Sequence, residues 1–248
     1  MGFYQHISKY YDEIFPVSDD FVGFVLRNAP RNEALFVDLG CATGELDIQI
    51  FQRAIPLGYS TPMGFLGLDL NGTMIDLACK KAMDQNIPAQ FFQDDLLNFP
   101  SYLHNEKAQC IYCLGNTLPH ITGRGLIEKL LKSVHQNLAR SGVFLIQMLN
   151  YDNIVGQGPT DLPCIQTENV IFNRKNTVKG SDIHFETHLH LKNTNEKWTD
   201  TTLLLGLRAK EITLLLQQAG FSEVEVYGNL NQTPWEPSSP LTCVVAKV

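Results

Sequence analysis

Residues 36–44 read FVDLGCATG, an apolar run that contains one aspartate and leads into two closely spaced glycines. The apolar part is typical of a buried strand. Gly40 and Gly44 allow a tight turn and a close approach of a ligand to the backbone, because they carry no Cβ atom. A helical pattern begins directly afterwards. The stretch therefore predicts a strand, a glycine-rich turn and a helix, the repeating unit of an open α/β sheet.

Four further apolar runs, at 64–70, 89–95, 108–115 and 142–149, resemble the first run at 34–40 in length and composition. Short continuous apolar runs are expected for strands that are covered on both faces of a parallel sheet. Helical patterns separate them, and the clearest runs from Gly125 to Ala139, where apolar residues recur every three or four positions. This alternation predicts right-handed βαβ connections and an α/β sheet with helices on both faces.

The pattern changes after Asn150. Residues 151–170 contain two glycines and two prolines, which predict an irregular loop. Three runs with two-residue periodicity follow and predict an antiparallel meander. A helix over Ala209–Ala219 and two strands at 222–228 and 241–248 complete the pattern. We therefore predict a single domain over residues 1–248, with a small antiparallel β insertion at about 165–207.

The composition excludes several classes of protein. The 248 residues include 26 acidic and 19 basic ones, a formal net charge of −7. This balance argues against a nucleic-acid partner, because such affinity comes from clustered Lys and Arg. No apolar run approaches the roughly 20 residues that span a bilayer, and residues 1–15 lack the features of a signal peptide. We therefore expect a cytoplasmic protein with no membrane partner.

The six cysteines are scattered along the chain, and Cys110 and Cys113 form the only C-x-x-C pair. The pair lies in a predicted strand, where residues three apart point to opposite faces and cannot readily hold one metal ion. We expect both to be buried, reduced thiols.

Carboxylates lie near the ends of the first three predicted strands. They are Asp38, Asp69 and the pair Asp94 and Asp95. Ligands of open α/β sheets bind beyond the carboxyl ends of the strands, and a carboxylate placed like Asp69 accepts the two hydroxyls of a ribose. Glu45 occupies the last position of a G-x-G-x-x-G fingerprint, where its charge would repel a pyrophosphate, and there is no P-loop. The pattern favours an adenosine-like ligand without phosphate.

Four stretches in this order, FVDLGCATG, GLDL (67–70), FFQDDLLNFP (91–100) and IYCLGNTLPHI (111–121), resemble a class I S-adenosylmethionine-dependent methyltransferase. The resemblance spans roughly residues 34–149. It implies a Rossmann-like seven-stranded sheet, with S-adenosylmethionine as cofactor and S-adenosylhomocysteine as product. The family's glycine motif, D/E-x-G-x-G-x-G, has Ala42 in place of its middle glycine here. We expect a small adjustment of the loop rather than loss of binding.

The resemblance also implies roles for particular residues. Residues 40–44 would line the methionine moiety, Asp69 would hold the ribose, and Asp95 would face the adenine amino group. Tyr11 would bond the ligand carboxylate, although an equally good alternative is that it packs a helix onto the core. The full set of cofactor-binding candidates is Tyr11, Asp38, Gly40, Cys41, Ala42, Gly44, Asp69, Leu70, Asp94, Asp95, Leu96, Cys113, Leu114, Gly115 and Asn116.

The sequence gives less information about the methyl acceptor. Residues 113–121 are similar to small-molecule N-methyltransferases of the glycine/sarcosine type, and they lack the N/D-P-P-Y/F motif of base methyltransferases. His120 is the candidate catalytic base, because an imidazole titrates near pH 6.5; a capping or core role is the alternative. We predict methyl transfer to a small molecule, first of all an amine. The alternatives are O- or C-methylation of a quinone or polyketide-like acceptor, and a non-catalytic S-adenosylmethionine-binding module.

The insertion raises further expectations. His184, Glu186, His188 and His190 alternate and share one strand face, which is compatible with a metal site, an active-site wall or a solvated surface. We favour the solvated surface and predict no metal. We expect the insertion to select the acceptor, with little influence on cofactor affinity, and residues 151–165 to act as its hinge. A homodimer is compatible with the sequence.

Overall fold

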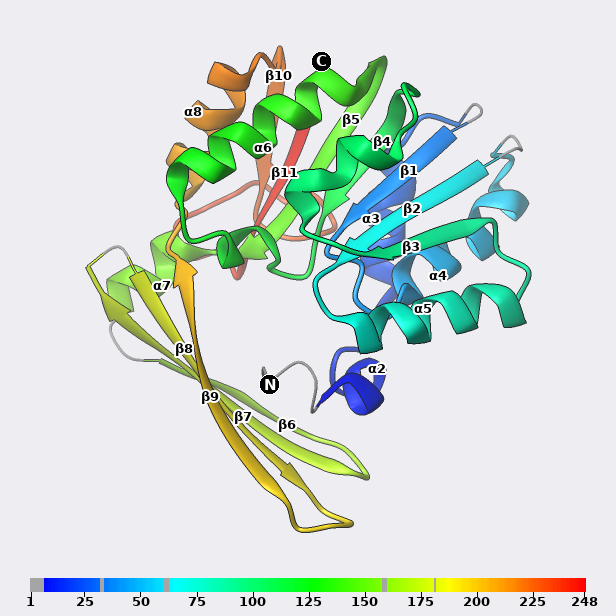
Figure 1. Cartoon of the computed structure of the whole chain (residues 1–248). Helices are drawn as coiled ribbons and strands as arrows, with labels where there is room; N and C mark the ends of the chain where they lie inside the picture. The colour runs from blue at the N-terminus through cyan, green and yellow to red at the C-terminus, as the bar shows by residue number, and fades with distance from the viewer. Residues whose placement is uncertain (1–6, 32–33, 60–62, 158–159, 181) are drawn as a thin grey trace.

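The computed structural model describes residues 7–31, 34–59, 63–157, 160–180 and 182–248. Within these residues, seven strands form the main sheet in the order β10-β11-β5-β4-β1-β2-β3 (Figure 1). The strands are β1 (Ala34–Leu39), β2 (Met63–Asp69), β3 (Ala89–Gln93), β4 (Ala108–Cys113), β5 (Leu138–Leu149), β10 (Glu223–Tyr227) and β11 (Leu241–Lys247). Strands β1 to β5 are parallel, and β11 is antiparallel to both of its neighbours. The predicted α/β sheet is confirmed.

Helices cover both faces of this sheet. On one face, α6 (Arg124–Asn137) and α8 (Ala209–Ala219) pack with the short helix η3 (Leu96–Tyr102). On the other face lie α3 (Asp19–Asn28) and α4 (Glu45–Ala54), followed by η2 (Ile55–Leu57), and α5 (Gly72–Asp84) packs beside α4. Cys113 belongs to the first apolar cluster and Cys110 to the second, so the C-x-x-C thiols point to opposite faces as predicted.

The insertion forms a second, four-stranded antiparallel sheet in the order β6-β7-β8-β9. Its strands are β6 (Thr160–Gln166), β7 (Val170–Lys179), β8 (Asp182–Leu191) and β9 (Lys197–Leu205), and helix α7 (Tyr151–Gln157) precedes them. The irregular loop predicted for 151–170 is therefore wrong. Pro163 lies on the edge strand β6, at a shift of register between Leu162 and Ile165, where a missing backbone N–H is tolerated. Gly158 and Pro159 lie outside the described residues.

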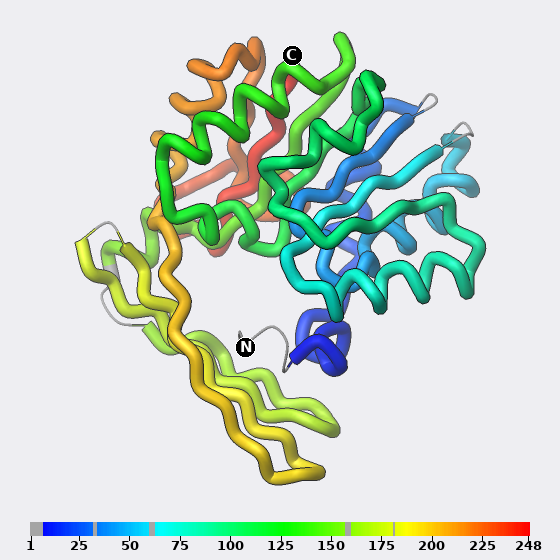
Figure 2. Tube along the Cα trace, viewed as in Figure 1, coloured from blue at the N-terminus to red at the C-terminus, as the bar shows by residue number. Residues whose placement is uncertain are grey.

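The start of the described chain lies between the two sheets (Figures 1 and 2). It comprises η1 (Ser8–Tyr10) and α2 (Tyr11–Ile14). Ile7 and Ile14 are buried against Met74 of α5 and against Phe172 and Leu189 of the second sheet. This packing places α2 beside the glycine-rich turn, because Ala42 contacts the same cluster.

No helix in the described ranges has both the length and the apolar character needed to span a bilayer. The division into one domain with an insertion stays a prediction.

Candidate active site

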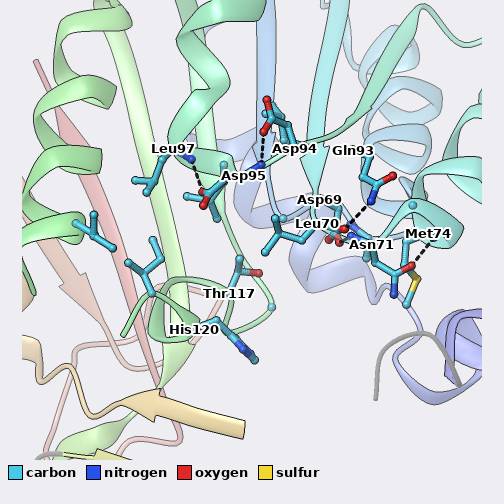
Figure 3. Close-up of a pocket in the computed structure, with 18 of the residues that line it drawn as sticks. Asp69, Leu70, Asn71, Met74, Gln93, Asp94, Asp95, Leu97, Thr117 and His120 are labelled. Atoms are coloured by element: carbon cyan, nitrogen blue, oxygen red, sulfur yellow. Dashed lines mark hydrogen bonds between the residues drawn. The ribbon is translucent and has the colours of Figure 1, made fainter. Parts of the chain in front are cut away.

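A cavity of about 600 Å³ opens at the carboxyl ends of the parallel strands. This edge is the ligand-binding edge of open α/β sheets. Figure 3 shows Asp69 at the end of β2 and Asp94 and Asp95 after β3 on one side of the cavity, and Thr117 and His120 on another. The predicted residues that line it are Tyr11, Gly40, Ala42, Asp69, Leu70, Asp94, Asp95, Leu96, Gly115 and His120. The fold therefore brings most of the sequence-predicted residues to one cavity.

The other predicted site residues do not line the cavity. They are Asp38, Cys41, Gly44, Cys113, Leu114 and Asn116. All but Asn116 are buried in the strands or turns that support the cavity. Asn116 accepts hydrogen bonds from the Leu149 backbone N–H, at 3.0 Å, and from the Tyr151 hydroxyl, at 3.1 Å. Its side chain therefore fixes the end of β5.

Asp69 connects the two loops that form the floor of the cavity. Its Oδ2 accepts from the Ala42 backbone N–H at 3.0 Å, and its Oδ1 accepts from that of Asn71 at 2.9 Å. Burial raises the pKa of Asp69, and these two hydrogen bonds oppose the rise. The carboxylate thus holds the glycine-rich turn against the start of α5 while it faces the cavity.

The glycine-rich turn leaves no room for a side chain at Gly40. A Cβ atom there would lie 2.4 Å from Cγ2 of Thr117, and the residue has a φ of +95°. Ala42 also adopts a left-handed conformation, with a φ of +47°. An alanine tolerates this conformation at a cost of roughly 1–2 kcal/mol, whereas glycine adopts it freely.

Ala42→Gly is expected to leave S-adenosylmethionine affinity within about tenfold of the wild type, because only one methyl group is lost and the N–H that bonds Asp69 remains. The variant's free energy of unfolding should rise or stay level. Titration calorimetry and thermal melting measure the two effects. A complete loss of binding, or a hundredfold gain, would contradict this account of the turn.

The two aspartates after β3 have different surroundings. Asp94 accepts from the side chains of Asn98 and Tyr102, at 2.9 and 2.8 Å, and these bonds lower its pKa. Asp95 caps η3 by accepting from the Leu97 backbone N–H at 2.9 Å. Both oxygens of the Asp94 carboxylate thus accept hydrogen bonds from residues that follow it closely in the chain. Asp95 has one oxygen engaged in the cap, which makes it the better placed of the two for a ligand.

Lys81 of α5 ties α2 to the glycine-rich turn. Its ammonium lies 2.5 Å from Asp12 and 2.9 Å from Glu45, and it donates to the Thr43 hydroxyl at 3.1 Å. The Thr43 hydroxyl in turn donates to Asp12. Glu45 is therefore paired, and its charge alone does not exclude a phosphate, contrary to the expectation from the sequence.

A buried acidic pair lies beneath the turn. Asp47 of α4 accepts a hydrogen bond from the Tyr112 hydroxyl, and its second oxygen has no partner within the described chain. Burial raises the pKa of Asp47 to about 7, and the bond from Tyr112 opposes the rise. Burial, with the nearby carboxylates of Asp47 and Asp69, also raises the pKa of Asp38.

Asp47→Asn is expected to make the protein less sensitive to alkaline pH. Because the folded state raises this pKa above its unfolded value of 3.8, Asp47 stabilises the wild type most below that value. The contribution is lost as the pH rises through about 7, to the extent of ~2–4 kcal/mol. The melting temperature of the variant relative to the wild type should therefore increase between pH 4 and pH 8. If the melting temperatures of the variant and the wild type changed by the same amount over this range, Asp47 would not be titrating.

The histidine-rich strand lies away from the cavity. His188 is exposed and its Nδ1 is 3.1 Å from the Thr199 hydroxyl, while Nε2 of His190 is 2.9 Å from Oδ1 of Asn195. Among the described residues no three His, Cys, Asp or Glu side chains are grouped so that they could hold a metal ion. These contacts are those of a solvated sheet face.

Sequence reasoning missed a second group of lining residues. They are Leu68, Asn71, Gly72, Met74, Gln93, Leu97, Thr117, Ile121, Thr122 and Leu126. Leu68 and Gln93 lie at the ends of β2 and β3, and five others follow β2, β3 or β4 within five positions, so extending the strand-end rule beyond the aspartates would have found these seven. Leu126 has no such signal, because it lies in α6 and reaches the cavity only through the packing of that helix.

Comparison with known proteins agrees with this geometry. Residues 36–142 match the family model described as "Methyltransferase domain". The matched stretch is that of an S-adenosylmethionine-dependent methyltransferase. This result sets aside the non-catalytic binding module that the sequence left open.

The methyltransferase is similar to a carboxy-S-adenosyl-L-methionine synthase of Wolinella succinogenes, with 27% identity over 204 residues, 82% of this chain and 74% of the relative. Among solved structures it resembles an S-adenosylmethionine-dependent methyltransferase from Clostridium acetobutylicum, with a TM-score of 0.78, 16% identity and coverage of 100% and 99%. It also resembles the sugar N-methyltransferase KedS8 from Streptoalloteichus, with a TM-score of 0.69, 16% identity and coverage of 97% and 92%. At such identities the solved structures establish the fold alone. The Wolinella relative is a carboxy-S-adenosyl-L-methionine synthase and not a glycine or sarcosine methyltransferase.

Proposed function

We propose that this methyltransferase acts on a small-molecule acceptor, first of all an amine. The observation that carries the proposal is His120, which ends η4 (Leu118–His120) and lines the cavity. Burial lowers the pKa of His120, so its imidazole is neutral at pH 7. A neutral imidazole beside the cavity is suited to accept the proton that an ammonium acceptor must lose before it attacks.

The cavity fits the cofactor. Gly40 and Ala42 line the cavity, and the Asp69 carboxylate suits two ribose hydroxyls. Leu70 lines the cavity with 71% of its surface exposed, an apolar face of the kind that a planar base covers. Bound S-adenosylmethionine would supply a methyl group already activated by its positively charged sulfur.

The chain's own contribution is then alignment and proton acceptance. In methyl transfer most of the gain comes from holding the nucleophile in line with the reacting carbon. Tyr11 on α2 and His120 on η4 belong to different parts of the fold and both line the cavity, so an acceptor held between them would be oriented and shielded from water. O- or C-methylation would use the same arrangement, with His120 taking a proton from a hydroxyl or an acidic carbon.

A second candidate follows from the Wolinella relative. Its similarity extends over 82% of this chain, which favours a reaction on S-adenosylmethionine itself, with a carboxylated sulfonium as product. Incubation with methyl-tritiated S-adenosylmethionine, a panel of amines and a panel of small organic acids as carboxyl donors, followed by mass spectrometry of the sulfonium fraction, separates the two. Tritium in the amine fraction supports methyl transfer, and a sulfonium heavier by one carboxyl group supports the synthase reaction.

His120→Asn is expected to lower kcat for an amine acceptor by about 10²-fold or more at pH 7, because it removes the proton acceptor. The loss should shrink as the pH approaches the pKa of the amine, which is then neutral without help. S-adenosylmethionine affinity should stay unchanged. His188→Asn, on the solvated face, is the control and should behave as wild type. A pH-independent loss would point to a structural role for His120.

A further inference from the structure

One face of the second sheet carries polar groups where apolar ones are expected. Residues paired across strands share a face, so Phe172 lies with Leu189 and Trp198, Arg174 with Thr187, and Asn176 with Phe185. Phe172 and Leu189 pack against the cluster that includes α2. Ile183 and Leu204, farther along the same face, pack into the main core. This face is therefore the inner one, and Arg174 and Asn176 lie in the middle of it.

These two side chains lack the partners that buried polar groups normally have. Asn176 is 0% exposed, and neither its Nδ2 nor its Oδ1 has a hydrogen-bond partner in the described part of the chain. Nε of Arg174 is buried and equally unpaired, although its Nη2 donates to the Pro163 carbonyl at 3.0 Å. No ion pair of Arg174 occurs among the described residues. Unmatched groups of this kind in a native interior call for a ligand or a functional role.

Arg174 lies close to residues that line the cavity. The Arg174 guanidinium is 5.9 Å from the Phe15 ring, and that ring is 5.2 Å from the ring of Tyr11, which lines the cavity. On the other side, β9 packs against η4, which carries His120. Arg174 is therefore one layer behind the lining residue Tyr11, with Phe15 between them, and Asn176 follows two positions farther along the same face of β7.

We propose that Arg174 and Asn176 form the distal end of the acceptor site and select an acceptor that carries a carboxylate and an N–H or O–H donor. A guanidinium only donates, and it matches a carboxylate in charge and shape. Asn176 offers one donor group to the same carboxylate and one acceptor to an amine or hydroxyl. The inference rests on the proposed function and narrows it to acidic small molecules.

Binding to the complex with S-adenosylhomocysteine tests this without requiring turnover. The probes are 3-hydroxypropanoate, β-alanine, 4-aminobutanoate and 4-aminobenzoate, each compared with its carboxamide by titration calorimetry. At least one acid should bind ten times or more tighter than its amide. Arg174→Gln should abolish that difference. Asn176→Leu should weaken the acid at least tenfold without lowering the melting temperature, because it removes an unpaired buried amide. Asn173→Leu, at an exposed position of the same strand, is the matched control.

Each outcome bears on the proposal. Equal binding of acid and amide, no binding of any acid, or discrimination that survives in Arg174→Gln would overturn it. If Asn176→Leu bound the acid as tightly as the wild type does, Asn176 would not belong to the site. None of these results affects the proposed methyl transfer, which the tritium assay tests separately. Loss of tritium transfer with intact acid selectivity would in turn leave the binding site standing and remove the proposed reaction.

Discussion

Asp69→Ala is expected to weaken S-adenosylmethionine binding about 100-fold or more. Two ribose hydroxyls lose a charged acceptor, at roughly 1.5–3 kcal/mol for each bond, and every 1.4 kcal/mol is a factor of ten. The backbone N–H groups of Ala42 and Asn71 also lose their acceptor, so the glycine-rich turn is no longer tied to the start of α5. Titration calorimetry with S-adenosylmethionine measures the effect directly.

Two further variants make this result specific. Asp94→Ala removes a neighbouring carboxylate that lines the same cavity but bonds to Asn98 and Tyr102, and it should change the affinity by less than about threefold. Asp95→Ala, which removes one proposed bond to the base, should cost about tenfold. If Asp69→Ala bound the cofactor as well as Asp94→Ala, the assignment of Asp69 to the ribose would be wrong.

Phe172→Ala is expected to reduce both stability and cofactor affinity. Phe172 is 0% exposed, and its ring meets that of Phe15 edge-on with the centroids 5.8 Å apart. Removing such a side chain costs ~3–5 kcal/mol of folding free energy. Because Phe15 also contacts Tyr11, α2 should detach from the cavity, and we expect S-adenosylmethionine affinity to fall about tenfold or more. This differs from the sequence expectation that the insertion has little influence on the cofactor.

Ile183→Ala is the matched control. Ile183 is also 0% exposed and lies in the same sheet, but it packs against the main core instead of α2. It should lower the melting temperature while leaving cofactor affinity unchanged. Equal cofactor affinity in both variants, each measured below its melting temperature, would restore the view that the second sheet serves the acceptor alone.

Local patterns were enough to predict the main sheet and much of the floor of the cavity. The apolar runs coincide with β1 to β5 within a few residues, and the helix predicted over Ala209–Ala219 has those bounds in the structure. Asp69 and Asp95 were predicted to lie at one edge because parallel strands place their carboxyl ends there, and both line the cavity. Asn116 follows the same pattern after β4, and only the structure shows that its side chain bonds to the end of β5.

The tertiary structure alone decided how the remaining parts meet. Nothing within 151–170 distinguishes an edge strand with Pro163 from a loop, because the pairing that makes β6 a strand comes from β7. The contact of α2 with Phe172 and the unpaired state of Asn176 likewise depend on residues far apart in the chain. Periodicity and strand ends are properties of short segments, which a sequence displays. Burial and hydrogen-bond partnership are properties of surfaces brought together on folding, and these determine which side chains remain available for a ligand.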